Sequence, residues 1–156
     1  MLILLAEPLA AVQSHAEEAF PRECCGLLLG RVLDGPGTPA ARREAVRALR
    51  ARNLVTERAH DRYEMDPRDR LGAEREAQAT GLEVIGFYHS HPEHDAYFSQ
   101  TDLERSEEYQ FGEPWLPPSY SYLVVSVREG RVVDRKAFQV VGGRSEEQPI
   151  QVADRP

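Results

Sequence analysis

Two histidines separated by one residue are the first feature of this sequence that could do chemistry. His89 and His91 flank Ser90 and follow Val84–Tyr88, a β-branched and aromatic run that predicts a strand. Residues two apart on a strand share a face, so the two imidazoles project together from the strand's end. Asp102 comes eleven residues after His91, and the intervening loop can fold its carboxylate back to the same point.

This set of residues predicts a zinc site. Two imidazole nitrogens and one carboxylate oxygen are typical of catalytic zinc, in which the fourth position stays open. A His-x-His pair alone is a weak signal, because a strand can also place two histidines on a solvent-facing surface. The aspartate at a fixed distance makes the full pattern specific. We therefore predict Zn²⁺ with His89, His91 and Asp102 as ligands.

A hydrolytic zinc site also needs a group that moves protons. Zinc lowers the pKa of bound water to about 7, and a carboxylate must take that proton to the leaving amine. Glu23 stands at the entrance of the apolar run Cys24–Gly30 and can do this if that strand runs beside the histidines. Taken alone, Glu23 also fits a solvated carboxylate at a strand entrance. Ser99 can donate a hydrogen bond to the oxyanion, and it equally fits a helix N-cap, which is a compatible role.

Cys24 and Cys25 are the two cysteines of the chain, and they are adjacent. This spacing suits neither a disulfide framework nor a repeated CxxC metal site. Either thiol could be considered as a nucleophile or a ligand. Because both precede a run of leucines, we interpret them as small buried packing residues and leave them out of the site.

Length and charge limit the classes of function. A chain of 156 residues fits one domain, and a net charge of -7 argues against a nucleic-acid partner. The apolar opening Met1–Ala6 lacks a positive leader and is too short to span a membrane, so we predict a first buried strand and no membrane association. The cytoplasm is the default compartment.

Strands and helices alternate around the candidate residues. Apolar spacing, caps and turn residues predict helices over Pro8–Phe20, Asp66–Gly81 and Ser99–Tyr109, strands over Cys24–Gly30, Glu44–Val55 and Leu82–Tyr88, a turn over Asp34–Pro39, and a hairpin of Ser119–Val127 with Val132–Val140. Ser99 and Asp102 have the spacing of a capping box. The domain is expected to span residues 1–141, and the polar tail 142–156 is expected to be loose.

Glu23, His89-Ser90-His91-Pro92, Ser99 and Asp102 together resemble the motif of the JAMM (MPN-plus) zinc metalloproteases. Further segments are similar to the compact prokaryotic branch of that family: Asn53, Arg62-Tyr63, Asp66-Pro67, Leu82–Tyr88 and Ser119–Val127. The resemblance extends from about Pro8 to about Val140. It implies an α/β (α+β) fold with a mixed β-sheet core flanked by helices, related to the cytidine-deaminase layout.

The resemblance also implies an activity. Zinc would be held by two histidines and one aspartate, with Glu23 as general acid/base and Ser99 as oxyanion stabiliser. Members cleave peptide or isopeptide bonds after the C-terminal Gly-Gly of ubiquitin or ubiquitin-like proteins, and compact bacterial members act on small sulfur-carrier proteins. The chain lacks the long insertions of the ubiquitin-chain cleavers, so polyubiquitin is not the expected substrate.

Two other functions and one structural question stay open. A zinc hydrolase of small amides or amino-acid conjugates would need the same site, and a non-catalytic scaffold could share the fold. Among the oligomeric states, a homodimer is one candidate. Since a Gly-Gly tail has no side chains to grip, we expect it to pair as an extra strand on an exposed edge at Arg42–Leu54, with the loop Asp61-Arg62-Tyr63 nearby. That segment could instead be an edge protected by charge.

Overall fold

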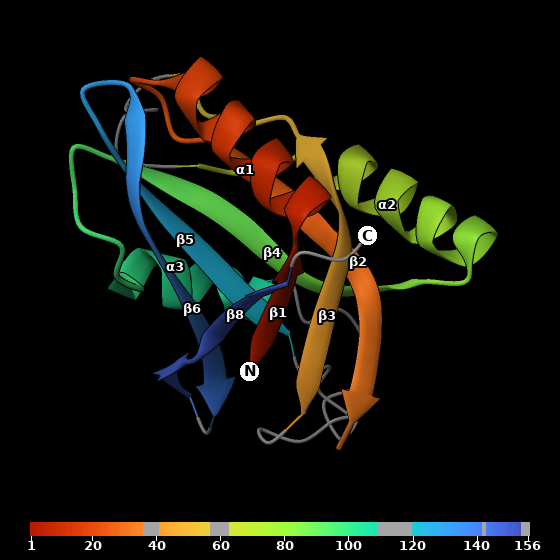
Figure 1. Ribbon diagram of the computed structural model, residues 1–156. Coiled ribbons are helices and arrows are strands. Elements are labelled where there is room, and N and C mark those ends of the chain that lie inside the picture. Colours follow the sequence, from red (N-terminus) through yellow and green to blue (C-terminus); the bar gives the residue numbers. More distant parts are fainter. Residues whose placement is uncertain (36–40, 57–62, 109–119, 142, 154–156) are drawn as a thin grey trace.

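The computed structural model describes residues 1–35, 41–56, 63–108, 120–141 and 143–153, and only the main chain of Arg105, Glu107 and Glu108. Its elements follow in the order β1 (Leu2–Leu5), α1 (Ala6–Ala19), β2 (Cys25–Asp34), β3 (Arg42–Ala51), α2 (Pro67–Thr80), β4 (Glu83–Pro92), α3 (Gln100–Glu108), β5 (Ser121–Arg128), β6 (Arg131–Val141), β7 (Arg144–Gln148) and β8 (Ile150–Ala153). The strands form one mixed sheet in the order β7-β6-β5-β4-β2-β3-β1-β8 (Figure 1). The predicted α+β class is confirmed.

Helices cover both faces of this sheet. Val12 of α1 packs with Leu28 of β2 in one buried cluster, and Ala77 of α2 packs with Leu27 in the other. Successive residues of β2 point to opposite faces, so a strand covered on both sides has to be apolar at every position. None of the described helices is both long and apolar enough to cross a membrane.

β4 lies inside the sheet and carries both histidines near its end. It pairs antiparallel with β2, where Cys25 lies opposite His89, and parallel with β5. Gly26 lies opposite Tyr88, and a Cβ at Gly26 would overlap the Tyr88 ring. The Tyr88 hydroxyl in turn lies 2.7 Å from Nδ1 of His15 on α1. This packing leaves little freedom in the register between β2 and β4 beside the candidate ligands.

The predicted caps and turns are confirmed where the structure describes them. Asp66 precedes α2, and its side chain accepts a hydrogen bond from the Arg68 N–H at 2.9 Å. Gly81 ends α2 in the left-handed region, with φ 71°. The hairpin between β5 and β6 turns at Glu129 and Gly130, whose φ angles are 52° and 81°.

β3 is only partly the exposed edge that we expected. Its first residues pair with β2 on one side and in parallel with β1 on the other, where Leu2 faces Arg43 and Leu4 faces Ala45. The expectation of a free edge is therefore wrong for residues 43–45. From Val46 to Ala51, β2 is the strand partner found among the described residues. The pairing with β1 is a contact distant in sequence, which a local pattern does not encode.

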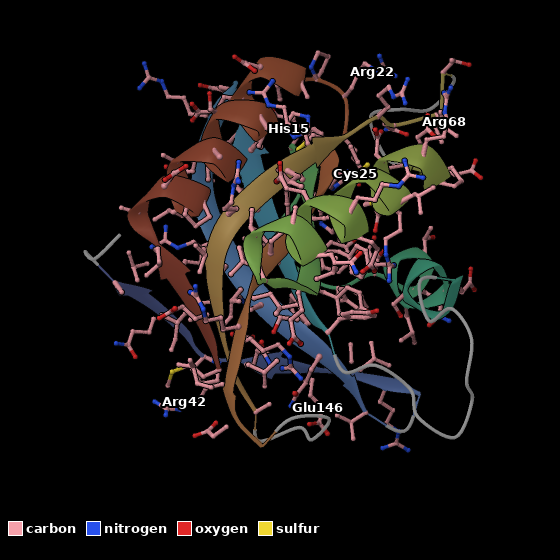
Figure 2. All side chains as sticks on the ribbon, turned by 90° about the vertical axis from the view of Figure 1, so that its right-hand side faces the viewer. His15, Arg22, Cys25, Arg42, Arg68 and Glu146 are labelled. Carbon is pink, nitrogen blue, oxygen red and sulfur yellow. The ribbon has the colours of Figure 1, made fainter. Side chains whose placement is uncertain are left out.

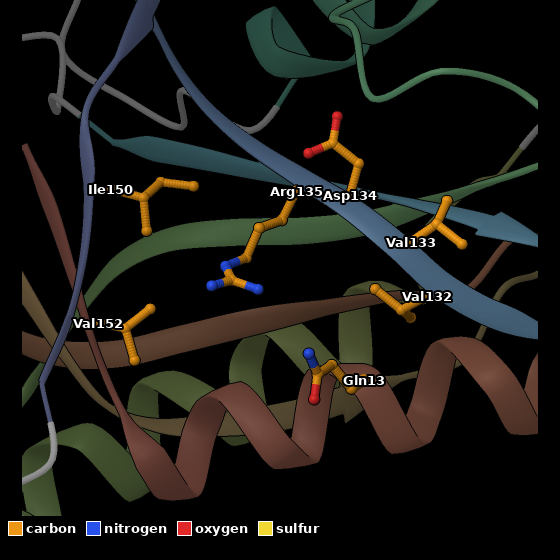
Figure 3. A pocket seen from close by; sticks show the side chains of 7 residues that line it. All are labelled: Gln13, Val132, Val133, Asp134, Arg135, Ile150 and Val152. Carbon is orange, nitrogen blue, oxygen red and sulfur yellow. The ribbon is translucent and has the colours of Figure 1, made fainter.

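Residues 143–153, the described part of the tail, are not loose as we expected. β7 pairs with β6, and β8 pairs in parallel with β1, so this segment joins the two ends of the sheet. These strands were not predicted because β7 is exposed at four of its five positions and therefore lacks an apolar pattern. Main-chain hydrogen bonds form the pairing without apolar side chains. A cleft of about 380 Å³ remains between β6, β8 and α1, with Arg135 beside Ile150 and Val152 (Figure 3).

Candidate metal centre

Three side chains from β4 and α3 meet at one point, as predicted. Nε2 of His89 and Nε2 of His91 lie 3.0 Å and 3.1 Å from Oδ2 of Asp102, and 3.2 Å from each other. Tetrahedral zinc with bonds of about 2.0–2.1 Å spaces its ligand atoms roughly 3.3 Å apart. The spacing of the three atoms therefore fits one small cation.

A reciprocal capping box fixes Asp102. The Asp102 N–H donates to Oγ of Ser99 at 3.0 Å, and the Ser99 N–H donates to Oδ2 of Asp102 at 2.9 Å. That same oxygen faces both histidines. The oxygen that accepts the capping hydrogen bond is thus the one that faces both imidazoles, with the spacing that the sequence predicted.

Contacts on the far sides of the imidazoles hold the rings in place. Nδ1 of His91 lies 2.9 Å from the main-chain carbonyl oxygen of Asp95. A carbonyl only accepts, so Nδ1 carries a proton and Nε2 is the nitrogen left for a metal. The Tyr63 ring stacks on His89 with centroids 4.8 Å apart and planes 24° apart. Both histidines and Asp102 are buried.

The electrostatics of the cluster favour ionised groups. Burial by itself would raise the pKa of Asp102, but the charges and hydrogen bonds of His89 and His91 outweigh it and lower that pKa. Burial would lower the pKa of His91, but Asp102, the Asp95 carbonyl and Glu23 together raise it. A bound cation would compete with protonation of His91, because a metal-binding imidazole has to be neutral.

Glu23 lies beside this cluster and is buried. A carboxylate oxygen of Glu23 and one ring nitrogen each from His89 and His91 lie within 4.8 Å of one another. Glu23 could therefore either ligate a metal or reach a water beside it. The contacts of 3.0–3.1 Å between the histidines and Asp102 favour Asp102 as the third ligand.

Main-chain and side-chain contacts bring the start of β2 to the end of β4. The Cys24 N–H donates to Oγ of Ser90 at 2.8 Å, and the Ser90 N–H donates to the Cys24 carbonyl at 3.1 Å. Nδ2 of Asn53 donates to the Glu23 carbonyl at 3.1 Å. The main chain that follows the Glu23 side chain is thus held.

Glu23 lies where two clefts meet. The first has a volume of about 260 Å³ and is lined by Glu23, His91, Pro92, His94, Tyr97, Ser99, Thr101 and Asp102. The second has a volume of about 440 Å³ and is lined by His15, Glu18, Ala19, Arg22, Glu23, Cys24, Ala51, Arg52 and Asn53. His15 and Arg22 lie at the same end of the molecule in Figure 2. A substrate could approach Glu23 from either side.

Both cysteines are buried free thiols, as their interpretation as packing residues requires. Their side chains belong to different apolar clusters, Cys25 on the α2 face and Cys24 on the α1 face, and Cys25 lies inside the molecule in Figure 2. Burial raises the pKa of both, that of Cys24 to about 12. Neither thiol therefore has the thiolate character that a nucleophile needs.

Several residues around the site were not predicted from the sequence. Ser90 could have been found, because the middle residue of His-x-His must face away from the histidines toward a neighbouring element. Tyr63 and Asn53 belonged to the family resemblance without a role. Asp95 acts through its main-chain carbonyl, and no residue type signals such a contact.

Comparisons with known proteins agree with this site. A family profile described as prokaryotic homologs of the JAB domain matches residues 6–141. The profile covers most of the chain, and together with a relative named as a peptidase it places the chain in a class of hydrolases with the JAB/MPN fold. The chain belongs to the family of prokaryotic homologs of the JAB domain. The resemblance predicted from the motif, and the enzyme class that it implies, are confirmed.

Two proteins of related sequence and one solved structure are similar to this chain. Desampylase of Haloferax volcanii is 33% identical over 129 residues, which cover 80% of each chain. CysO-cysteine peptidase of Mycobacterium tuberculosis is 26% identical over 155 residues, 99% of this chain and 93% of that protein. The structure of a JAB1/MPN domain protein from Archaeoglobus fulgidus has a TM-score of 0.57 at 16% identity, covering 97% of this chain and 98% of that one, and supports the fold alone.

Proposed function

We propose that this protein is a zinc-dependent peptidase or isopeptidase that cleaves after the C-terminal Gly-Gly of a small ubiquitin-like or sulfur-carrier protein. The observation that carries the proposal is the convergence of His89, His91 and Asp102 within 3.0–3.2 Å of one another, with Glu23 beside them. A solvent-facing histidine pair would show neither this burial nor this carboxylate.

In this proposal His89, His91 and Asp102 hold the metal. A zinc ion there supplies Lewis acidity, which makes water a better nucleophile and polarises a carbonyl. The burial of the three ligands keeps bulk water from competing with them. The capping contacts of Ser99 hold Asp102 in the orientation that ligation needs.

Glu23 is proposed as the general acid/base. Its carboxylate would take the proton of the attacking water and deliver it to the amine that leaves. A carboxylate oxygen of Glu23 lies within 4.8 Å of one ring nitrogen of each histidine, which is close enough to reach a water bound beside them. A residue that shuttles protons must reach the reacting water without occupying its position.

Ser99 is proposed as the group that stabilises the carbonyl oxygen as it becomes negative. Its Oγ already accepts the Asp102 N–H, so the hydroxyl proton of Ser99 is available for donation. Ser99 lines the same cleft as Glu23 and Asp102. A donor in that position strengthens its hydrogen bond as charge develops on the oxygen.

The proposed substrate class follows from two relatives and from the site. Those relatives carry the names desampylase and CysO-cysteine peptidase, which supports a small ubiquitin-like or sulfur-carrier protein. A Gly-Gly tail must be recognised through its main chain, and strand addition is the simplest way to do so. The stretch of β3 from Val46 to Ala51 keeps an edge for this, whereas Asp61 and Arg62 lie outside the described residues. Association into a homodimer and a cytoplasmic location stay predictions.

Cleavage of an extended sulfur carrier tests the substrate class. We expect that a carrier extended beyond Gly-Gly is cut after the second glycine. A bulky residue in place of that glycine should abolish the cut, because the proposed recognition depends on a tail without side chains. Mass spectrometry of the products gives the position of the cut. Cleavage elsewhere, or equal rates with the bulky residue, would contradict the Gly-Gly specificity and favour a hydrolase of small amides.

A further inference from the structure

The loop after β4 supplies the group that contacts Nδ1 of His91. The His91 Nδ1 contact goes to the Asp95 carbonyl, a main-chain group in the middle of this loop. Groups that orient a metal-binding histidine from behind fix both the ring plane and the nitrogen that carries the proton. The position of the Asp95 carbonyl therefore matters to the site, although Asp95 is no candidate ligand.

The loop has few internal contacts of its own. Glu93, His94 and Asp95 are exposed, and Glu93 has a φ of 59°, a conformation that costs energy for a residue with a side chain. The main-chain hydrogen bonds from the His94 N–H and the Tyr97 N–H, at 3.5 Å and 3.0 Å, stay close to the loop itself. A rigid position must come from another element.

The hairpin of β5 and β6 provides the contacts that hold the loop in position. Arg128, at the end of β5, donates from Nη1 to the Glu93 carbonyl at 2.8 Å and from Nη2 to Oδ1 of Asp95 at 2.7 Å. One guanidinium thus holds the loop at both ends of the three-residue stretch that contains the Asp95 carbonyl. Its planar fork can serve two acceptors at once, which an ammonium cannot do with the same geometry.

Other contacts dock the same loop on the hairpin but do not replace Arg128. They run from the Glu93 N–H to the Val127 carbonyl at 2.7 Å, from Oγ of Ser126 to the His94 carbonyl at 2.5 Å, and from the Glu129 N–H to Oε1 of Glu93 at 2.8 Å. Among the described contacts between hairpin and loop, the Arg128 bond is the one that reaches Asp95.

We propose that Arg128 is a positioning residue of the metal centre: by clamping Glu93 and Asp95 to the hairpin it fixes the Asp95 carbonyl, and through that carbonyl the orientation of His91. The inference rests on the proposed function in that it takes His91 as a ligand. It adds a functional link between the β5–β6 hairpin and the site.

Two measurements on three variants test this link. Arg128→Ala removes both bonds, and Arg128→Lys keeps a cation that can make one of them. Arg131→Ala is the matched control. Arg131 is an exposed arginine across the same turn, and its side chain makes no hydrogen bond or ion pair in the part of the chain that the structure describes. Zinc affinity is measured by competition with a chelator. Solvent exchange of the His91 Nδ1 proton is measured by NMR in the metal-free protein.

We expect Arg128→Ala to bind zinc about tenfold more weakly, the lower end of the range for groups that orient ligands, and to exchange the Nδ1 proton faster. For Arg128→Lys, both the zinc affinity and the exchange rate should lie between those of Arg128→Ala and those of the unchanged protein. For Arg131→Ala, both values should equal those of the unchanged protein. The proposal is overturned if Arg128→Ala and Arg131→Ala agree in both measurements.

Two safeguards keep the test decisive. If Arg128→Ala does not fold, Asp95→Asn takes its place, because it weakens the Arg128 contact but leaves the main-chain carbonyl. It should shift both measurements in the same direction by less, and unchanged values would overturn the proposal. If the unchanged protein binds no zinc, the proposed function fails, whereas the proton exchange in the metal-free protein still decides the role of Arg128.

Discussion

At the scale of residues, Asp102 both caps a helix and faces the candidate ligands. Its Oδ2 accepts the Ser99 N–H and faces both imidazoles. Without a cation, this buried carboxylate helps to raise the pKa of His91. In the proposed function, the same oxygen would bind the cation. The cap therefore brings the carboxylate into place before any metal arrives.

Zinc content tests the ligand assignment. The unchanged protein should hold about one zinc per chain, and His89→Ala and Asp102→Ala should each lose most of it, because two ligands alone bind zinc weakly. Elemental analysis of the purified proteins gives the ratio. His94→Ala is the control, since His94 is exposed and only lines the cleft. Full zinc in both ligand variants would refute the assignment.

At the scale of elements, α2 is held at its start by Asp66, which is buried and accepts from the Arg68 main chain and side chain. The Arg68 side chain, its N–H and the charge of Arg52 lower the Asp66 pKa to about 2. A lowered pKa means that the ionised carboxylate stabilises the folded state. This contribution is complete above the unfolded pKa of about 3.9 and is lost as the pH falls through the folded pKa.

Stability of Asp66→Ala across pH tests this contribution. At neutral pH the variant should unfold at lower denaturant than the unchanged protein, because its helix lacks the cap. The difference in unfolding free energy between the two proteins should stay constant down to about pH 4 and shrink between about pH 4 and about pH 2. Asp134→Ala, on the exposed side of β6, is the control. A gap that is independent of pH would show that charge is not the cause.

The sequence predicted the local elements and the site more fully than the pairing of distant strands. Glu23, His89, His91, Ser99 and Asp102 were predicted from residue types at fixed spacings, and the structure brings them together. The β1–β3 and β1–β8 pairings join segments far apart in sequence, and no period in either segment encodes its partner.

At the scale of the whole molecule, the last strands complete the sheet. β8 pairs with β1 from Leu2 to Leu5, and the Leu2 N–H donates to the Pro149 carbonyl at 3.0 Å. β1 carries four buried residues. The segment that the sequence analysis expected to be loose therefore covers one side of the strand that begins the fold.

Removal of the residues after Gly142 tests this role. The shortened chain should lose more than ~2 kcal/mol of unfolding free energy, since it gives up the partial burial of Ile150 and ladder hydrogen bonds on two strands. Denaturant unfolding of both chains measures the difference. Equal stability of the two chains would show that residues 143–156 add little to the stability of the fold, which is what a loose tail would do.

The most direct test of the central claim is Glu23→Gln in the presence of zinc. Glutamine keeps the size of the side chain but cannot accept the proton, so the variant should retain about one zinc per chain and lose ~10²–10⁴-fold in the rate of cleavage after Gly-Gly. Mass spectrometry of an extended sulfur carrier over time, together with zinc analysis of the same sample, gives both values. Retained zinc with almost no cleavage is the predicted result, and cleavage at the unchanged rate would contradict the account of this site.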